Sequence, residues 1–404
     1  MIKVLMLFCG VLLGGIVPLV EAATLRVGPA ERIRSVAQAA RLARDGDTVE
    51  ITAGTYVGDV AVWSQKRLTI RGVGGRPRLL AGGRSAEGKG IWVIRGDEVT
   101  VDNITFEGAR VPARNGAGIR HEAGFLWIRN CRFRDNETGI LTGNELSLSL
   151  RVEDSEFSHG VDASPRISHL LYAGRIGRLE VRGSTFHHAV VGHLIKSRAQ
   201  LSIVEYNSLF DGEGGRGSYE LEFPEGGVAV VLGNLIGQSP GTENPRMLAY
   251  GAEGLIYPDN RLYVASNTFV DNLPSGGEFI ALWSPEKVKL QVVNNLFVGG
   301  CAQRACPEGL VSHGRRGVFQ EERSGGRGDR EEEGNVLVPE GAARVVLADQ
   351  HYRPSMAHRW PAKPLPEPAE GEPDLVPRRQ YRAPVGSRSL GRRSELRAAG
   401  AFQP

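Results

Sequence analysis

A short motif recurs along the middle of this chain: two apolar residues flank one other residue, and Phe follows five residues later. Successive copies end 24 to 33 residues apart. Alternation of apolar and polar residues is typical of a strand with one buried face, and a strand-only repeat of this length indicates a solenoid. We therefore predict an all-β chain of stacked coils. Clear copies end at Phe106, Phe133, Phe157, Phe186, Phe269 and Phe297, and looser copies end at Phe210 and Ile236.

An Asn shortly before the closing Phe marks several copies, as at Asn103, Asn267 and Asn295. Such an Asn suits a turn that needs left-handed backbone and a side-chain amide that stacks on its neighbours. A β-sandwich or a propeller is the alternative all-β fold, but neither explains this spacing. The pattern resembles the right-handed parallel β-helix (solenoid) of the pectate-lyase-like superfamily over roughly residues 24–300. The resemblance implies three strands per coil.

The ends of the chain have different patterns. Residues 23–60 are expected to form an N-terminal cap of strand, helix and strand, with the helix over residues 32–44. Such a helix can cover the open end of a solenoid and its unpaired edges. The β-helix is expected over residues 61–345, with a Gly-, Arg- and Glu-rich insertion near residues 312–334. Residues 346–404 form a Pro/Arg-rich tail that either lies along the solenoid or hangs free.

Residues 1–22 are typical of a secretory signal peptide, with Lys3 before an apolar run and a small-residue site before Ala23. A short membrane anchor is the alternative. We expect a secreted or periplasmic monomer that has no membrane contact after signal removal. In an oxidising compartment Cys301 and Cys306 either form a disulfide across a loop or remain separate thiols. The net charge of +3 does not indicate a nucleic-acid partner.

The best candidate for chemistry lies between Ser168 and Gly227. Strand alternation places Tyr172, Lys196 and Glu222 together on an outer wall, with Leu171, Ile195 and Leu221 on the inner side. Arg198 and Glu220 are expected on the same wall. His169 and His193 precede equivalent strand positions; they either stack inward as core residues or face the wall as proton donors.

Lys196 is unusual because only 7 of the 49 basic residues are Lys. Unlike Arg, Lys can become a general base when a neighbouring cation lowers its pKa, and Arg198 is expected to supply that effect. The alternative is a salt bridge between Lys196 and Glu220 or Glu222. Arg246, Tyr250 and Glu253 are expected to extend the wall, with Arg120, His121 and Glu122 higher up. Such a row suits an extended anionic chain.

The segment from Ile195 to Ile236 resembles the active coil region of polysaccharide lyase family six, which includes chondroitinase B and alginate lyases. The resemblance implies that Lys196 is the base and that Ca²⁺ neutralises a uronate carboxylate. The family's Arg acid does not carry over, because Glu222 lies near that place. Its Asn and Glu calcium ligands are not evident either. We therefore name no metal ligands and keep Ca²⁺ as a candidate cofactor.

These observations favour an enzyme that acts on an acidic polysaccharide by β-elimination. Lys196 would remove the C5 proton, Arg198 and Arg246 would hold the carboxylate, and Tyr172 or a His would protonate the leaving oxygen. A C5 epimerase needs the same proton abstraction. The other classes are a non-catalytic glycan-binding or adhesion solenoid, and a hydrolase that uses Glu220 and Glu222 as paired carboxylates.

Overall fold

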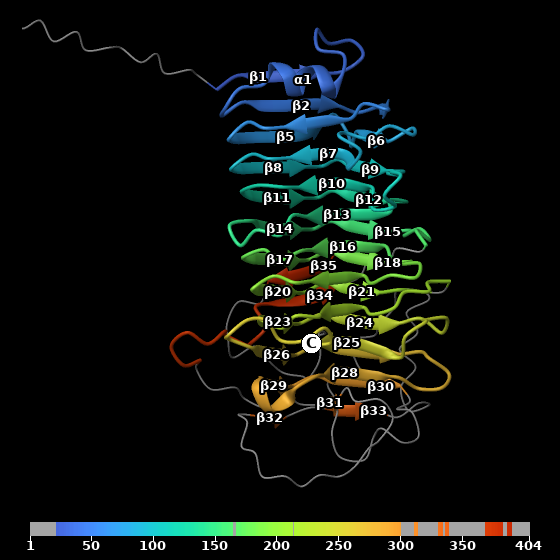
Figure 1. Cartoon of the computed structure of the whole chain (residues 1–404), viewed down its shortest axis with the longest axis vertical. Helices are drawn as coiled ribbons and strands as arrows, with labels where there is room; N and C mark the ends of the chain where they lie inside the picture. Colours follow the sequence, from blue (N-terminus) through green and yellow to red (C-terminus); the bar gives the residue numbers. More distant parts are fainter. Residues whose placement is uncertain are drawn as a thin grey trace, which may run out of the picture.

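The computed structural model describes residues 22–164, 167–212, 214–299, 311–313, 330–333, 336–338, 368–382 and 386–389. Residues 1–21, most of the predicted 312–334 insertion, and Cys301 with Cys306 lie outside the described residues. The chain winds into a parallel β-solenoid whose coils stack along one long axis (Figure 1). Within the described residues, three long parallel sheets of 12, 11 and 10 strands run the length of the solenoid, so the predicted all-β, stacked-coil architecture is confirmed.

The first sheet consists of β1 (Thr24–Val27), β2 (Thr48–Thr52), β5 (Arg67–Val73), β8 (Glu98–Asp102), β11 (Phe125–Arg129), β14 (Ser149–Glu153), β17 (Arg178–Arg182), β20 (Leu201–Glu205), β23 (Val228–Leu232), β26 (Arg261–Ala265), β29 (Lys289–Val293) and β32 (Arg330–Glu333). The second sheet consists of β3 (Thr55–Val57), β6 (Arg78–Leu80), β9 (Thr105–Glu107), β12 (Arg132–Arg134), β15 (Glu156–Ser158), β18 (Thr185–His187), β21 (Ser208–Phe210), β24 (Leu235–Gln238), β27 (Thr268–Asp271), β30 (Leu296–Gly299) and β33 (Val336–Val338). The third sheet consists of β4 (Ala61–Trp63), β7 (Gly90–Ile94), β10 (Ala117–His121), β13 (Thr138–Thr142), β16 (His169–Ala173), β19 (Ile195–Ser197), β22 (Leu221–Phe223), β25 (Arg246–Tyr250), β28 (Glu278–Leu282) and β31 (Val311–His313).

The repeated Phe forms a stack inside the second sheet. The rings of Phe106, Phe133, Phe157 and Phe186 lie 4.5–5.1 Å apart with interplanar angles of 10° or less. All four side chains are buried. Because the coils stack in register, one Phe of each coil points inward directly over the Phe of the next coil. This explains why the motif repeats in the sequence.

The Asn positions divide into two roles that the sequence interpretation had merged. Asn103 has left-handed backbone, with φ of 59°, whereas in later coils Ser266 and Asn294 take the left-handed position. Asn267 and Asn295 come one residue later and form a buried ladder, in which Asn267 Nδ2 donates to Asn295 Oδ1 over 3.0 Å. One Asn therefore makes the turn while the next joins successive coils.

At the N-terminal end, α1 (Val36–Leu42) is shorter than the predicted 32–44 helix because Ser35 is its N-cap. The Ser35 side chain accepts from the Gln38 N–H over 3.1 Å, and both Asp59 carboxylate oxygens accept from first-turn N–H groups. The helix buries Val36, Ala39 and Ala40. Because β1 pairs with β2, the segment predicted as a separate cap already belongs to the first sheet. None of the described helices is long and apolar enough to cross a membrane.

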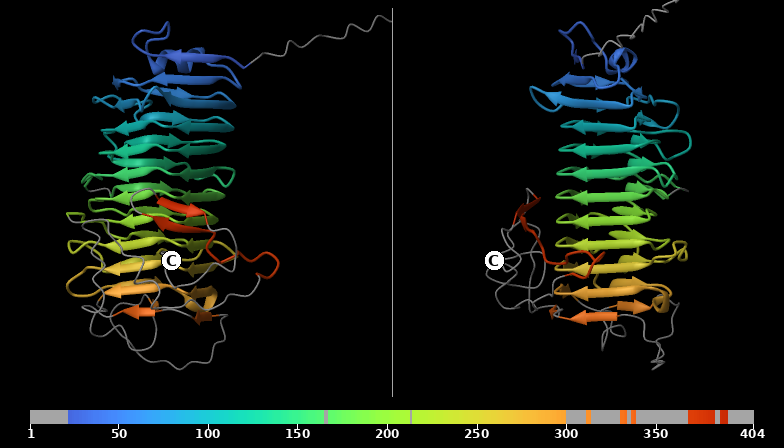
Figure 2. Two further views of the ribbon diagram at one scale, coloured as in Figure 1. Left: turned by 180° about the vertical axis from the view of Figure 1, so that it is seen from behind. Right: turned by 90° about the vertical axis from the view of Figure 1, so that its left-hand side faces the viewer.

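Part of the C-terminal tail packs on the outer side of the first sheet, in the lower half of the solenoid (Figure 2). Leu375 covers a cluster that includes Tyr206, Leu232 and Tyr263. The Tyr206 hydroxyl also accepts from the Arg378 N–H over 2.8 Å. The first alternative for the tail, that it lies along the solenoid, is therefore confirmed for residues 368–378. Beyond them, β34 (Arg379–Arg382) and β35 (Gly386–Ser389) pair antiparallel.

Candidate functional site

The middle of the third sheet carries the predicted row of polar residues. Tyr172 pairs with Lys196 across β16 and β19, and Lys196 pairs with Glu222 across β19 and β22. Their strand neighbours Leu171, Ile195 and Leu221 are fully buried in the core. Alternation therefore placed these six residues correctly.

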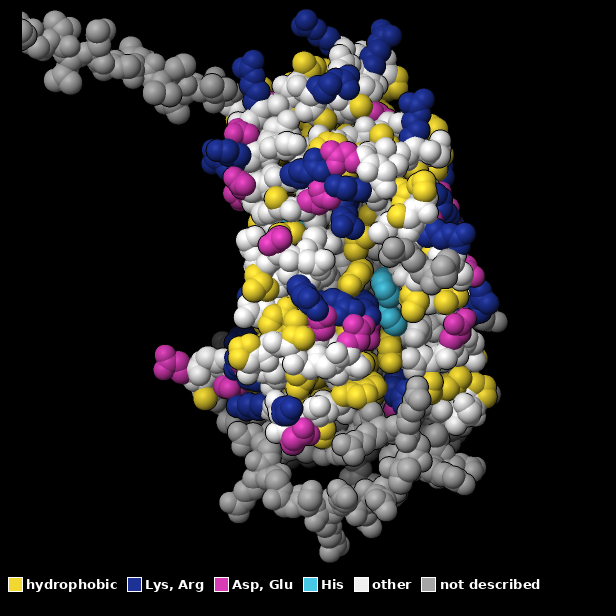
Figure 3. Space-filling view, viewed as in Figure 1, with side chains coloured by type: hydrophobic (Ala, Val, Ile, Leu, Met, Phe, Trp, Pro, Cys, Tyr) yellow, Lys and Arg dark blue, Asp and Glu magenta, His cyan; other side chains and the backbone are white. Residues whose placement is uncertain are grey.

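We call seven residues on this face the central cluster: Tyr172, His193, Lys196, Arg198, Glu222, Glu225 and Glu253. Figure 3 shows basic and acidic side chains gathered about halfway along the molecule, with histidine beside them. Most of the cluster's charge is shielded from water, since the side chains of Lys196, Arg198, Glu222 and Glu225 are between 4% and 14% exposed. At this depth the ion pairs are screened much less than surface pairs.

Lys196 lies between two carboxylates. Its Nζ is 2.8 Å from Glu222 Oε2 and 2.9 Å from Glu253 Oε1. Burial alone would lower the pKa of Lys196, but the two carboxylates outweigh it and the pKa is raised. The expectation that Arg198 lowers this pKa is therefore wrong, because negative charge surrounds Lys196. The alternative salt bridge with Glu222 is present.

Arg198 links the rest of the cluster. Its guanidinium forms an ion pair with Glu225 and another with Glu253 Oε2 at 2.6 Å. Its Nε donates to the Tyr172 hydroxyl over 2.9 Å. Since this donation uses the oxygen as an acceptor, the O–H of Tyr172 remains available to donate elsewhere.

Three residues that sequence analysis missed hold Arg198 in place: Glu225, Arg175 and Tyr257. Arg175 donates twice to Glu225, over 2.8 Å each, so Glu225 lies between two guanidinium groups. The Tyr257 hydroxyl donates to the Arg198 carbonyl over 2.6 Å. Arg175 and Glu225 are 50 residues apart, in turns that follow strands of the third sheet. No periodic sequence pattern predicts which residues pair in such turns.

Glu222 is the deepest carboxyl on the outer side of the cluster, at 3% exposure. Its Oε2 is 2.8 Å from Lys196 and 3.3 Å from His193 Nε2. Burial raises the pKa of Glu222, and Lys196 only partly opposes this. The carboxylate is therefore a stronger base than an ordinary Glu side chain.

His169 and His193 stack with ring centroids 4.5 Å apart. They lie on the outer side, since His193 contacts Glu222 and the His169 ring is 5.3 Å from the Tyr172 ring; the inward alternative is wrong. His193 Nδ1 accepts from the Tyr219 N–H, so neutral His193 carries its proton on Nε2, facing Glu222. Burial lowers the pKa of His169 to about 3 and that of His193 well below its ordinary value, so both rings are neutral near pH 7.

Glu220 does not belong to this wall. It aligns with Leu194 on one side and Met247 on the other, and both are buried in the core. The chain bends at this corner, so Glu220 and Leu221 both point inward. Burial, followed by the charge of Asp211, raises the pKa of Glu220 well above its ordinary value. The predicted hydrolase pair of Glu220 and Glu222 is therefore wrong, because the two carboxyls lie on opposite sides of the sheet.

The other three predicted binding residues have different positions. Tyr250 is fully buried, and its hydroxyl donates to the Gly227 carbonyl, so its place on the wall is contradicted. Arg246 is on the outer side, 2.8 Å from Glu278 and with its guanidinium 5.8 Å from the Trp283 ring centroid. Glu253 belongs to the central cluster through Lys196 and Arg198.

A second group of charges lies nearer the N-terminal end of the same face (Figure 3). We call Glu87, Lys89, Arg95, Arg120 and Glu122 the N-terminal cluster. Glu122 pairs with Lys89 at 2.7 Å and with Arg95 at 2.8 Å, and Glu87 pairs with the same two cations. The neighbouring His121 points inward, and burial lowers its pKa to about 4.

Calcium binding requires several oxygen donors that are free to point at one ion. Among the residues that the structure describes, no group of three or more His, Cys, Asp or Glu side chains is arranged to hold a metal ion. The acidic oxygens of the central cluster are bound to Lys196, Arg198 and Arg175 instead. These residues do not fit Ca²⁺ as expected from the resemblance, and no step below is routed through it.

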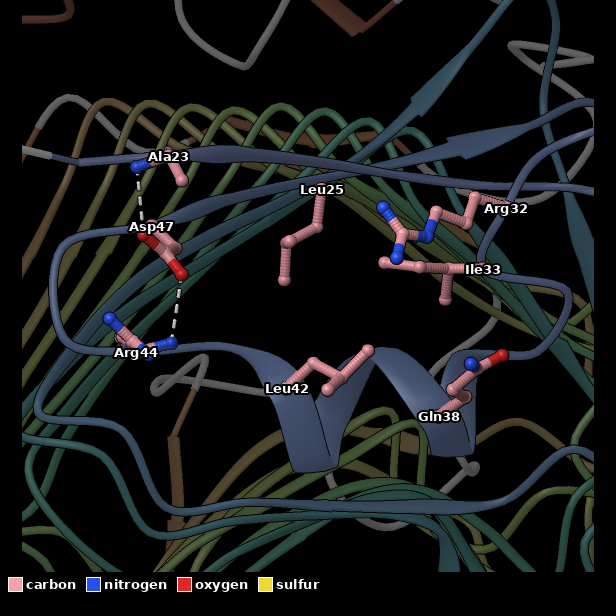
Figure 4. A pocket seen from close by; sticks show the side chains of 8 residues that line it. All are labelled: Ala23, Leu25, Arg32, Ile33, Gln38, Leu42, Arg44 and Asp47. Carbon is pink, nitrogen blue, oxygen red and sulfur yellow. Dashed lines mark hydrogen bonds between the residues drawn. The ribbon is translucent and has the colours of Figure 1, made fainter.

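A pocket of about 590 Å³ opens between β1 and α1 at the N-terminal end (Figure 4). Leu25, Ile33 and Leu42 line it together with Arg32 and Gln38. The Asp47 carboxylate at its edge accepts from the Ala23 and Arg44 N–H groups over 2.8 Å each. No residue of the predicted site lines this pocket.

No protein-family model matches this chain, and no curated protein sequence matches it. Among solved structures, that of pectate lyase Pel9A is similar, with a TM-score of 0.50 and 10% sequence identity. The similarity covers 78% of this chain and 79% of that one. At this identity the comparison establishes the fold: a parallel β-helix like that of pectate lyase.

Proposed function

We propose that this protein, a pectate-lyase-like parallel β-helix, acts on an acidic polysaccharide by β-elimination. The observation that carries the proposal is the binding of one carboxylate by Lys196 and Arg198 together. Glu253 Oε1 is 2.9 Å from Lys196, and its Oε2 is 2.6 Å from Arg198. The paired cations thus bind a carboxylate through both of its oxygens, a geometry that also suits the carboxylate of a uronate sugar.

Glu253 can give way to a substrate. It lies in the loop between β25 and β26, and its side chain is 44% exposed. A uronate carboxylate that replaced it would meet the same two cations. Neutralising that carboxylate makes the adjacent C5–H more acidic, which is the electrostatic contribution that β-elimination needs.

The remaining groups suit proton transfer on either side of this carboxylate. Glu222, 2.8 Å from Lys196, takes the C5 proton, and the electron pair of that bond forms the C4–C5 double bond. The C4–O4 bond breaks, and Tyr172 donates its hydroxyl proton to the leaving oxygen. Lys196, whose pKa is raised, thus serves as a carboxylate-binding cation in place of the base first expected.

The proposal includes export from the cell as a monomer, through a signal peptide at residues 1–22. It also includes a right-handed coil with α1 as its end cap, as in the superfamily that the chain resembles. The stacked, neutral His169 and His193 lie on the N-terminal side of Glu222, with His193 Nε2 3.3 Å from Glu222 Oε2.

The test is a screen of the purified mature chain against alginate, chondroitin, pectate and glucuronan, with and without added Ca²⁺. A lyase produces an unsaturated uronate that absorbs ultraviolet light, and Lys196→Ala and Tyr172→Phe are expected to abolish the rise. New reducing ends without absorbance would indicate a hydrolase. Binding without either product would favour the glycan-binding solenoid.

A further inference from the structure

Arg120 is the incompletely paired cation of the N-terminal cluster. Three cations share the two carboxylates Glu87 and Glu122 there, and Lys89 and Arg95 make the close contacts. The ion pair of Arg120 among the described residues is a 3.6 Å contact between its Nε and Glu122 Oε1. This Nε is buried and has no hydrogen-bond partner in the described part of the chain.

Strand register places Arg120 in line with the central cluster. Arg120 pairs with Leu141, Leu141 with Tyr172, and Tyr172 with Lys196. These residues form one outward ladder that crosses four neighbouring strands of the third sheet. Three strand spacings correspond to ~14 Å between the backbones of Arg120 and Lys196.

We propose that Arg120 forms a second carboxylate-binding subsite and that the polysaccharide lies along the solenoid axis, across the strands. This inference rests on the proposed function, because Lys196 and Arg198 define the first carboxylate subsite. A guanidinium with uncommitted N–H groups suits bidentate recognition of a carboxylate. Leu141 gives the ladder an apolar surface between Arg120 and Tyr172, against which a sugar ring can lie.

The two subsites differ in their occupants. Glu253 already fills the pair of Lys196 and Arg198, whereas Glu122, the nearest carboxylate to Arg120, is held by Lys89 and Arg95. A uronate carboxylate at Arg120 therefore displaces no protein carboxylate. We therefore expect the Arg120 subsite to contribute to the binding of long oligosaccharides and not of short ones.

The experiment is calorimetric titration of the full mature chain, as its Tyr172→Phe variant, with uronate oligosaccharides from pectate and alginate. Disaccharides and octasaccharides are compared for Arg120→Gln, for Arg120→Lys and for the control Arg151→Gln. Arg151 is a suitable control because it lies on the first sheet with similar side-chain exposure, 33% against 25%. Thermal unfolding of each variant confirms that it folds.

Arg120→Gln is expected to weaken octasaccharide binding roughly tenfold while leaving disaccharide binding unchanged. Arg120→Lys restores part of the loss, and Arg151→Gln changes neither affinity. Equal octasaccharide affinity in Arg120→Gln, together with a loss in Arg198→Gln, overturns the second subsite and leaves the proposed function intact. If the parent binds no uronate and Arg198→Gln changes nothing, both proposals fail.

Discussion

The central cluster and the N-terminal cluster lie on one face of one sheet and contain similar charged side chains, yet they differ in depth and in the balance of their partners. In the N-terminal cluster the side chains of Lys89, Arg95 and Glu87 are 34–39% exposed, whereas those of Lys196, Glu222 and Glu225 are 4–10% exposed. Burial raises the pKa of Glu222, while the pKa of Glu122 is lowered because Lys89 and Arg95 outweigh its desolvation. Residue type is therefore less informative here than depth and the balance of partners.

The central cluster also has partners that the N-terminal cluster lacks among the described residues. A neutral imidazole and a phenol, His193 and Tyr172, lie against its ion pairs. A phenol can donate a proton and a neutral imidazole can accept or donate one, whereas an Arg–Glu ion pair only holds opposite charges together. The four predictions that follow test this contrast.

The largest expected effect is on turnover. Glu222→Gln keeps the size of the side chain but removes the base, and at least about a hundredfold loss of kcat is expected with little change in KM. The matched change in the N-terminal cluster, Glu122→Gln, is expected to leave kcat near the parent value. Initial rates of double-bond formation measure both variants. A Glu222→Gln enzyme with near-normal kcat would remove Glu222 from the mechanism.

The next effect is on stability. It concerns Glu220, which points inward on the side of the third sheet opposite the central cluster. Gly118 in β10 and Gly139 in β13 lie over the Phe stack, whereas Glu220, before β22, places a carboxyl next to Leu194 and Met247. One of its oxygens, Oε2, has no hydrogen-bond partner in the described part of the chain. Because burial raises its pKa, folded Glu220 keeps a proton that the unfolded chain releases, and stability falls as pH rises above the ordinary Glu value.

Glu220→Gln removes that titration, so it is expected to be more stable than the parent by ~1–3 kcal/mol at alkaline pH. The difference is expected to shrink as the pH falls towards the ordinary Glu value. Urea unfolding at several pH values measures it. A gap between variant and parent that does not depend on pH would mean that Glu220 is ionised in the folded protein.

The positions that sequence analysis placed wrongly have two different causes. The outward row of Tyr172, Lys196 and Glu222 follows from strict alternation, which is local and visible in the sequence. Glu220 is at a corner where two successive residues point inward, and alternation fails there. The apolar pair of Leu194 and Ile195 in the neighbouring coil marks the same position and carried the missing signal.

Tyr250 shows the reverse error. It lies two residues after Leu248, so alternation already placed it inside, and its polar hydroxyl was weighed too heavily. Partners such as Arg175 and Glu225 were not accessible by any pattern, because turns lack register and their contacts span two coils. The coils could thus be predicted from the sequence, and the central cluster only in part.

A smaller effect is expected on affinity. Glu253→Gln replaces the internal carboxylate that occupies Lys196 and Arg198 with a neutral amide, so uronate binding is expected to improve roughly tenfold, or ~1.4 kcal/mol. Asp259→Asn is the control, because it lies in the same loop but pairs with Arg261. Oligouronate titration compares the two variants. Weaker binding by Glu253→Gln than by Asp259→Asn would show that Glu253 supports the site and does not compete with the substrate.

The smallest effect is expected in the N-terminal cluster, where Glu87→Gln removes an exposed ion pair. The Arg95 and Lys89 hydrogen bonds lower the pKa of Glu87 to about 2, so its contribution to stability is present above the ordinary Glu value and is lost as pH falls towards 2. Solvent and salt screen this pair, so the unfolding temperature of Glu87→Gln should differ from the parent only slightly at low salt and not at high salt. Thermal melts across salt concentrations at neutral pH measure the difference. A large shift that survives high salt would show that this cluster is as well insulated from water as the central one, and the contrast drawn between them would fail.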